Sequence, residues 1–152
     1  MSKGVRRIIL RFGGGMLMIL GILHLLVTPF IARLISDNTT ESVATWLTPP
    51  MLLNHVVVGV LLLPLGFFTF YAAAPAVGGE PWALIVTRVS AVTVTTLPLI
   101  LFLLMGDRYF GAAPFVAATA TVCVAALALL AAAFWPERPI PPAGGSISQS
   151  QQ

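Results

Sequence analysis

The sequence predicts an all-α integral membrane protein, built as a bundle of four transmembrane helices. Of its 152 residues, 58% are hydrophobic and only 9% are charged, and the mean hydropathy is +0.97. So little polar surface cannot coat a water-soluble protein, and lipid must therefore cover much of the chain. Four long apolar stretches use nearly the whole length at about 20 residues for each membrane crossing.

The predicted spans are residues 12–35, 51–74, 82–105 and 114–135, which together form one transmembrane domain over residues 1–135. Polar residues or prolines mark the breaks between them. The breaks are Ser36-Asp37-Asn38, Pro49-Pro50, residues 75–81 and Gly106-Asp107-Arg108. The tail, residues 136–152, is rich in Pro, Gly, Ser and Gln, and we expect it to be disordered and cytoplasmic because it cannot bury enough apolar surface.

The longest predicted external loop, residues 36–50, has the pattern of a short helix lying on the membrane surface. Asn38 precedes Glu41 by three residues, which is a capping arrangement. Val43, Trp46 and Leu47 would share one face of such a helix. We expect Trp46 to anchor this interfacial helix, because tryptophan favours the membrane–water boundary.

Basic residues predict the orientation of the bundle. Lysine and arginine gather on the cytoplasmic side of membrane proteins. Six lie near the span ends of one side and two near the other: Lys3, Arg6, Arg7, Arg11, Arg88 and Arg138, against Arg33 and Arg108. We therefore expect both termini to be cytoplasmic in a bacterial-type inner membrane. The basic N-terminal cluster fits contact with anionic lipid headgroups, and we do not expect a nucleic-acid partner.

Two intramembrane histidines, His24 and His55, are the sharpest functional signal, because polar groups in a membrane are costly. Both lie on helix faces that contain small residues, where membrane helices approach closely. These faces comprise Gly14, Leu17, Gly21, His24 and Thr28 in the first span, and His55, Gly59, Leu62, Gly66, Thr69 and Ala73 in the second. Each histidine is therefore expected to point into a helix interface.

Three interpretations of the histidines stay open. In the first they are structural, and a neutral imidazole bonds a group such as Thr28 or Asn54. In the second, His24 and His55 ligate the metal of haem b or another tetrapyrrole, and Gly21 and Gly59 make space for the ring.

Depth bears on the second interpretation. His24 lies near the middle of its predicted span, whereas His55 lies only about 6 Å inside the outer end. The expected difference in depth, roughly 5 to 10 Å, favours separate one-histidine sites over one haem held by both. In the third interpretation, a quinone or another small lipid-soluble ligand is held by His55, Asn54 and Trp46 near the outer interface.

Other functional classes have less support from the sequence. Pro64 and Pro98 could break two helices of a transporter, but no Asp or Glu lies inside a span to carry protons or cations. No complete catalytic motif is present, so we do not expect an enzyme. Cys123 is the only cysteine and can form no internal disulfide.

The fourth span presents a smooth face of small residues, which suits close packing within the bundle or against a partner. Its members are Ala113, Ala117, Ala120, Val124, Ala128 and Ala131. Together these features predict a small integral membrane subunit or assembly protein of a larger, respiratory or photosynthetic, complex, with a haem, another tetrapyrrole or a quinone on its histidines. The partner would be a membrane protein or a second copy. The alternative is a small permease or a membrane protein that binds a lipophilic ligand.

Overall fold

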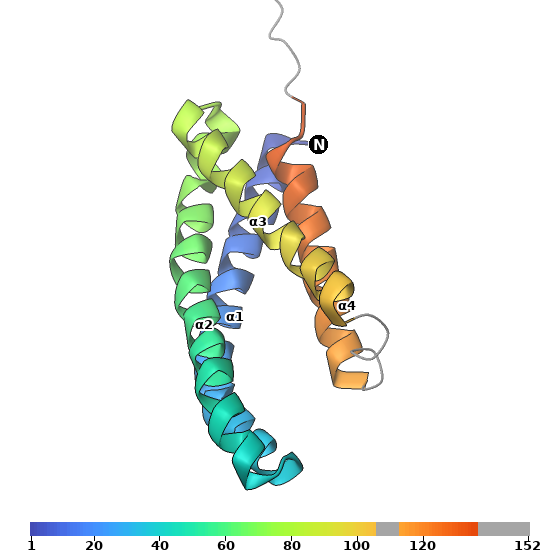
Figure 1. Cartoon of the computed structure of the whole chain (residues 1–152). Helices are drawn as coiled ribbons and strands as arrows, with labels where there is room; N and C mark the ends of the chain where they lie inside the picture. The colour runs from blue at the N-terminus through green and yellow to red at the C-terminus, as the bar shows by residue number, and fades with distance from the viewer. Residues whose placement is uncertain (106–112, 137–152) are drawn as a thin grey trace, which may run out of the picture.

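A computed structural model describes residues 1–105 and 113–136 of the chain. Over these residues the protein consists of α1 (Lys3–Asn38), α2 (Glu41–Gly78), α3 (Pro81–Met105) and α4 (Ala113–Ala133), with no strand among them (Figure 1). Three helices, α1, α2 and α3, are long and apolar enough to cross a membrane, and Thr119–Ala133 of α4 forms a shorter apolar helix. The prediction of an all-α membrane protein is consistent with this architecture.

The helices form two halves that meet at one end. Figure 1 shows the α1–α2 hairpin diverging from α3 and α4 toward the far end, and extending beyond them. The first turn of α1 and the last turn of α4 lie together, since Arg6 Nε donates to the Ala132 carbonyl at 2.8 Å. At 1.5 Å per residue, the 36 residues of α1 span about 54 Å and the 25 residues of α3 span about 37 Å. This difference in length explains why the α1–α2 hairpin extends beyond α3.

The predicted external loop over residues 36–50 is wrong. The chain turns at Thr39 and Thr40, and residues 41–50 are the first turns of α2 rather than a separate interfacial helix. The predicted capping pair does not form either: Thr40 is the N-cap residue, and Asn38 Nδ2 donates back to the Leu34 carbonyl at 2.9 Å. Trp46 is therefore a residue of α2, and its side chain is 84% exposed.

The second helix begins earlier than its prolines predict. Pro49 and Pro50 lie inside α2, as do Pro64 and Pro75. Proline removes one helical hydrogen bond and disfavours a helical residue before it, which is why the pair was expected to begin a helix. A long helix tolerates this loss where neighbouring groups and packing compensate, and α2 is packed against α1. Figure 1 shows the resulting hairpin as bowed.

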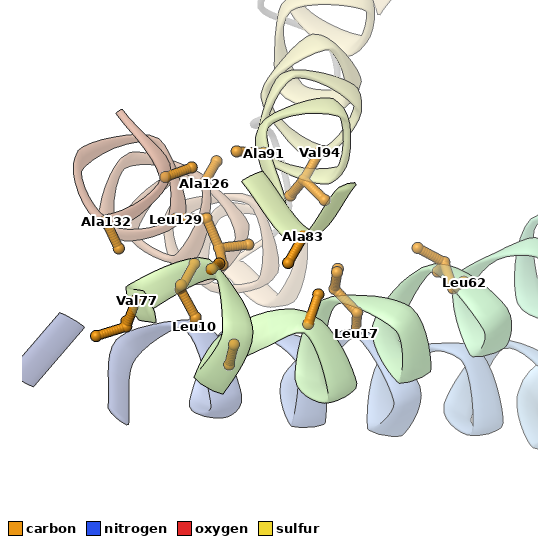
Figure 2. Close-up of a cluster of buried hydrophobic side chains, with 14 residues drawn as sticks. Leu10, Leu17, Leu62, Val77, Ala83, Ala91, Val94, Ala126, Leu129 and Ala132 are labelled. Atoms are coloured by element: carbon orange, nitrogen blue, oxygen red, sulfur yellow. The ribbon is translucent and has the colours of Figure 1, made fainter. Parts of the chain in front are cut away.

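The core lies where the two halves meet. Leu10 of α1, Val77 of α2 and Leu129 of α4 are at most 4% exposed and belong to one cluster of buried residues (Figure 2). Many of its other members are alanines, which let helix backbones approach closely. Large apolar side chains instead cover the outside: Leu103 is 84% exposed and Leu26 is 70% exposed. This distribution suits a protein whose surface contacts lipid.

Three members of the small-residue face predicted on α4 are turned outward, Ala128 is half-buried, and the side chains of Ala113 and Ala117 lie outside the described part of the chain. Ala120, Val124 and Ala131 are exposed, whereas Ala126 and Ala132 on the opposite side are buried. The expected tail, residues 136–152, lies outside the described residues except for Pro136, and so do Arg108, Arg138 and the break at residues 106–108.

Candidate functional site

His24 and His55 lie face to face in the α1–α2 hairpin. The ring centroids of His24 and His55 are 4.6 Å apart and the ring planes are inclined by 30°. Each histidine thus points into the helix interface, as its small-residue stripe predicts. The expected offset of roughly 5 to 10 Å between the two histidines is wrong, because their ring centroids are only 4.6 Å apart. The second helix begins at Glu41 rather than at residue 51, so His55 does not lie near the end of its helix.

Glycine contacts set the register that brings the histidines together. A Cβ atom added to Gly21 would lie 2.8 Å from the Gly59 carbonyl oxygen, and one added to Gly66 would lie 2.6 Å from the Gly14 carbonyl oxygen. Both distances are too short for any side chain, so the two backbones touch at these points. The Gly21–Gly59 contact is one turn from the histidines, and it fixes their rings opposite each other.

His24 is oriented by its own helix. Its Nδ1 lies 3.0 Å from the Leu20 carbonyl oxygen. A carbonyl can only accept, so Nδ1 carries the hydrogen and the neutral ring keeps its lone pair on Nε2. A metal-binding histidine is usually held in this way, with one nitrogen bonded to a carbonyl and the other left for the metal.

His55 contributes a buried nitrogen. Its Nε2 atom is enclosed and has no hydrogen-bond partner within the described part of the chain. A buried polar atom without a partner costs about 1–3 kcal/mol. The stacked pair therefore places one oriented nitrogen and one unsatisfied nitrogen in an apolar hairpin.

The other predicted site residues do not complete a pocket around the pair. The Thr28 hydroxyl donates to the His24 carbonyl at 2.8 Å, Asn54 is exposed, and Trp46 lies nine residues, about 14 Å, along α2 from His55. The quinone site expected from His55, Asn54 and Trp46 is thus not assembled. Gly21 and Gly59 face each other's backbone and leave no space for a macrocycle there.

A haem held between the two histidines does not fit this geometry. Axial ligation needs the nitrogens of two imidazoles to approach a metal from opposite sides, but these rings stack on their faces at 4.6 Å. Within residues 1–105 and 113–136 there is also no group of three or more His, Cys, Asp or Glu side chains that could hold a metal ion. One-sided ligation through Nε2 of His24 is compatible with the donor chemistry.

Three hydroxyls of α3 make local hydrogen bonds. Thr95 donates to the Ala91 carbonyl and Thr96 to the Thr93 carbonyl, both at 2.7 Å, and Thr87 donates to the Ala83 carbonyl at 2.9 Å. Such bonds satisfy a hydroxyl inside a helix without a ligand. These three side chains therefore give no support to a polar transport path.

The sequence interpretation missed the role of Arg6. This residue was assigned to lipid headgroups, but its side chain is 4% exposed and bonds the end of α4. The signal was present, since Arg6 precedes Leu10 by four residues and Leu17 by eleven, and so continues the stripe that faces the bundle.

The chain matches no known protein family, no curated protein and no solved structure.

Proposed function

We propose that this protein is a small integral membrane subunit or assembly protein that binds a ligand through His24 and His55. The observation that carries the proposal is the orientation of His24. Its Nδ1 hydrogen bond to Leu20 fixes the tautomer and leaves Nε2 as an acceptor. This bond stays within α1, so His24 contacts α2 through its ring stack on His55 and not through a hydrogen bond.

The acceptor character of Nε2 limits the class of ligand. It suits the metal of a tetrapyrrole, such as haem, or a hydrogen-bond donor such as a quinol hydroxyl. A bound haem would supply one-electron redox chemistry. His24 would hold it from one side, and the Leu20 carbonyl would keep the imidazole oriented. His55 would shield the other face of that imidazole through the ring stack.

The outer face of α4 supports the subunit role. An apolar groove of about 520 Å³ runs between α1 and α4, and small residues of α4 form one wall. In a membrane, small residues at a groove let a partner helix pack closely. The same surface also supports the alternative function, in which a lipophilic molecule rather than a partner helix occupies the groove.

The optical spectrum of the full-length protein, purified in a mild detergent, tests the ligand. We expect a Soret band that is lost in His24→Ala, because this change removes the ligating nitrogen. The band should persist, shifted, in His55→Ala, and be unchanged in Asn54→Ala, whose side chain is exposed. Circular dichroism would show that each variant is folded.

Solvent extraction and mass spectrometry of the same samples test whether the ligand is a quinone. A quinone that co-purifies with the unmodified chain and is lost from His24→Ala would identify the second ligand class. A folded preparation with neither pigment nor quinone would contradict the proposal. Co-purification of a membrane-protein partner in stoichiometric amount would support the subunit role. Co-purification of an apolar molecule that is displaced when the α1–α4 groove is filled would support the alternative function, binding of a lipophilic ligand.

Membrane topology gives a separate test. We propose four crossings with both termini in the cytoplasm, in a bacterial-type inner membrane, which follows from the basic residues near the start of α1. Reporter domains fused to the two ends in turn should both give cytoplasmic signals. A periplasmic signal at either end would exclude this arrangement, and a fusion after Asn38 should report the opposite side.

A further inference from the structure

A second hollow, unlike the apolar groove, lies at the basic end of the molecule where α2 turns into α3. We call it the turn hollow; it is open to the surface and has a volume of about 660 Å³. Its wall combines a cation, an anion and aromatic rings. The residues that matter are Arg11 of α1, Phe70 and Tyr71 of α2, Glu80 in the turn and Trp82 of α3.

The turn itself positions the anion. Gly79 has φ of 88°, a left-handed conformation that suits glycine, and closes α2. The Gly79 amide donates to the Ala76 carbonyl at 3.2 Å and the Glu80 amide to the Pro75 carbonyl at 3.1 Å. These bonds fix the backbone of Glu80, and the Trp82 indole N–H then donates to Glu80 Oε2 at 2.7 Å. The carboxylate is thus held in place with oxygen lone pairs still available.

The cation lies on a different helix. Arg11 Cζ is 5.5 Å from the centre of the Phe70 ring, which is cation–π geometry. Within the described residues, neither Arg11 nor Glu80 forms an ion pair, although both line the same hollow. The Tyr71 and Trp82 rings line the same hollow and are 6.1 Å apart. The hollow therefore presents separated positive and negative groups beside two aromatic rings.

The position of the turn hollow along the helices indicates that its ligand is a membrane lipid. Arg11 directly precedes the long apolar stretch of α1, and tyrosine and tryptophan favour the headgroup level of a membrane. We propose that the turn hollow binds the zwitterionic headgroup of an aminophospholipid. The Arg11 guanidinium bonds the phosphate, and the Glu80 carboxylate accepts hydrogen bonds from the primary ammonium, beside the Trp82 ring. The shared chemistry is a phosphoethanolamine group, which a soluble molecule also carries.

Lipid retention tests this site in the intact protein. The full chain is placed in nanodiscs made from equal amounts of palmitoyl-oleoyl phosphatidylethanolamine and phosphatidylglycerol, then extracted gently and weighed by native mass spectrometry. We expect phosphatidylethanolamine to be retained about fivefold over phosphatidylglycerol, which has the phosphate but no amine. Arg11→Gln should lower retention of both lipids, whereas Glu80→Gln should remove only the preference for the amine.

Two exposed residues at the far end of the hairpin provide matched controls. Arg33→Gln and Glu41→Gln make the same chemical changes outside the turn hollow, and both should leave retention unchanged. Equal retention of the two lipids by the unmodified protein would overturn the proposal. So would an equal loss in Arg33→Gln and Arg11→Gln, which would indicate only a general charge effect.

A fluorescence titration separates the lipid from a soluble ligand. Trp46→Phe combined with Trp135→Phe leaves Trp82 as the only tryptophan. Phosphatidylethanolamine added in detergent micelles should change its emission, and this change should be lost in Arg11→Gln. A response to free phosphoethanolamine with none to the lipid would overturn the lipid source. The His24 and His55 experiments are independent, so either proposal can fail alone.

Discussion

Replacement of Gly66 by alanine is expected to destabilise the α1–α2 hairpin by about 1–3 kcal/mol. A Cβ atom at this position would lie 2.6 Å from the Gly14 carbonyl oxygen and 2.7 Å from the Met18 amide nitrogen. Both are backbone atoms, so no side-chain rotation can relieve the overlap and the helices must separate. Gly14→Ala should behave alike, because its Cβ would lie 2.7 Å from the Gly66 carbonyl oxygen.

The neighbouring glycine is the control. A Cβ atom added to Gly15 would meet nothing within 4 Å. Gly15→Ala should therefore leave the stability unchanged or raise it, by up to about 1 kcal/mol, because alanine is the better helix former. Unfolding of the full chain in mixed detergent and sodium dodecyl sulfate, followed by tryptophan fluorescence, measures the difference. Equal stabilities for Gly15→Ala and Gly66→Ala would show that α1 and α2 do not touch at this register.

Separation of α1 and α2 by Gly66→Ala should also disturb the His24–His55 stack. The His24–His55 stack lies beside the Gly21–Gly59 contact, which depends on the same close approach as Gly14 and Gly66. If the proposed ligand is held by the oriented pair, Gly66→Ala should weaken its retention even though no ligating atom has changed. Gly15→Ala should not.

Replacement of Arg6 by alanine is expected to release the end of α4 from α1, at a cost of about 1.5–3 kcal/mol. The guanidinium donates from Nε to the Ala132 carbonyl at 2.8 Å, and the residue is 4% exposed. Carbonyls in the last turn of a helix lack helical partners and carry partial negative charge, so a buried cation stabilises them. Alanine removes this donor and leaves a cavity in place of a buried side chain.

Arg7 supplies the matched control, because it is the next residue of α1 and its side chain is exposed. Hydrogen exchange followed by mass spectrometry should show faster exchange in the last turn of α4 for Arg6→Ala, and no change for Arg7→Ala. Arg6→Lys keeps the charge without the guanidinium and should give an intermediate result. If Arg7→Ala had the same effect as Arg6→Ala, the general loss of positive charge rather than the bond to Ala132 would be responsible.

The amino-acid sequence by itself determined the class of the protein and the faces of its helices. High hydropathy and low charge predict membrane helices, because these are properties of local composition. The small residues around Gly21 and Gly59 recur at helical spacing, which is sufficient to predict that His24 and His55 point into an interface. Four crossings and cytoplasmic termini stay predictions from the same local signals.

Tertiary structure alone decided how these faces meet. The hairpin turns at Thr39 and Thr40 rather than at Pro49-Pro50, because packing against α1 carries α2 through its prolines. Contact between Gly21 and Gly59 then sets the register, and it brings into one stack two histidines that local counting placed at different depths.

The roles of the charged residues were likewise decided by tertiary structure. Composition places Arg6 and Arg11 in one basic cluster, but packing buries the first against α4 and leaves the second at the turn hollow with Glu80. The physical reason is that hydropathy and periodicity act along one helix. Register, burial and the pairing of distant charges depend instead on the close fit between helices, which no single segment contains.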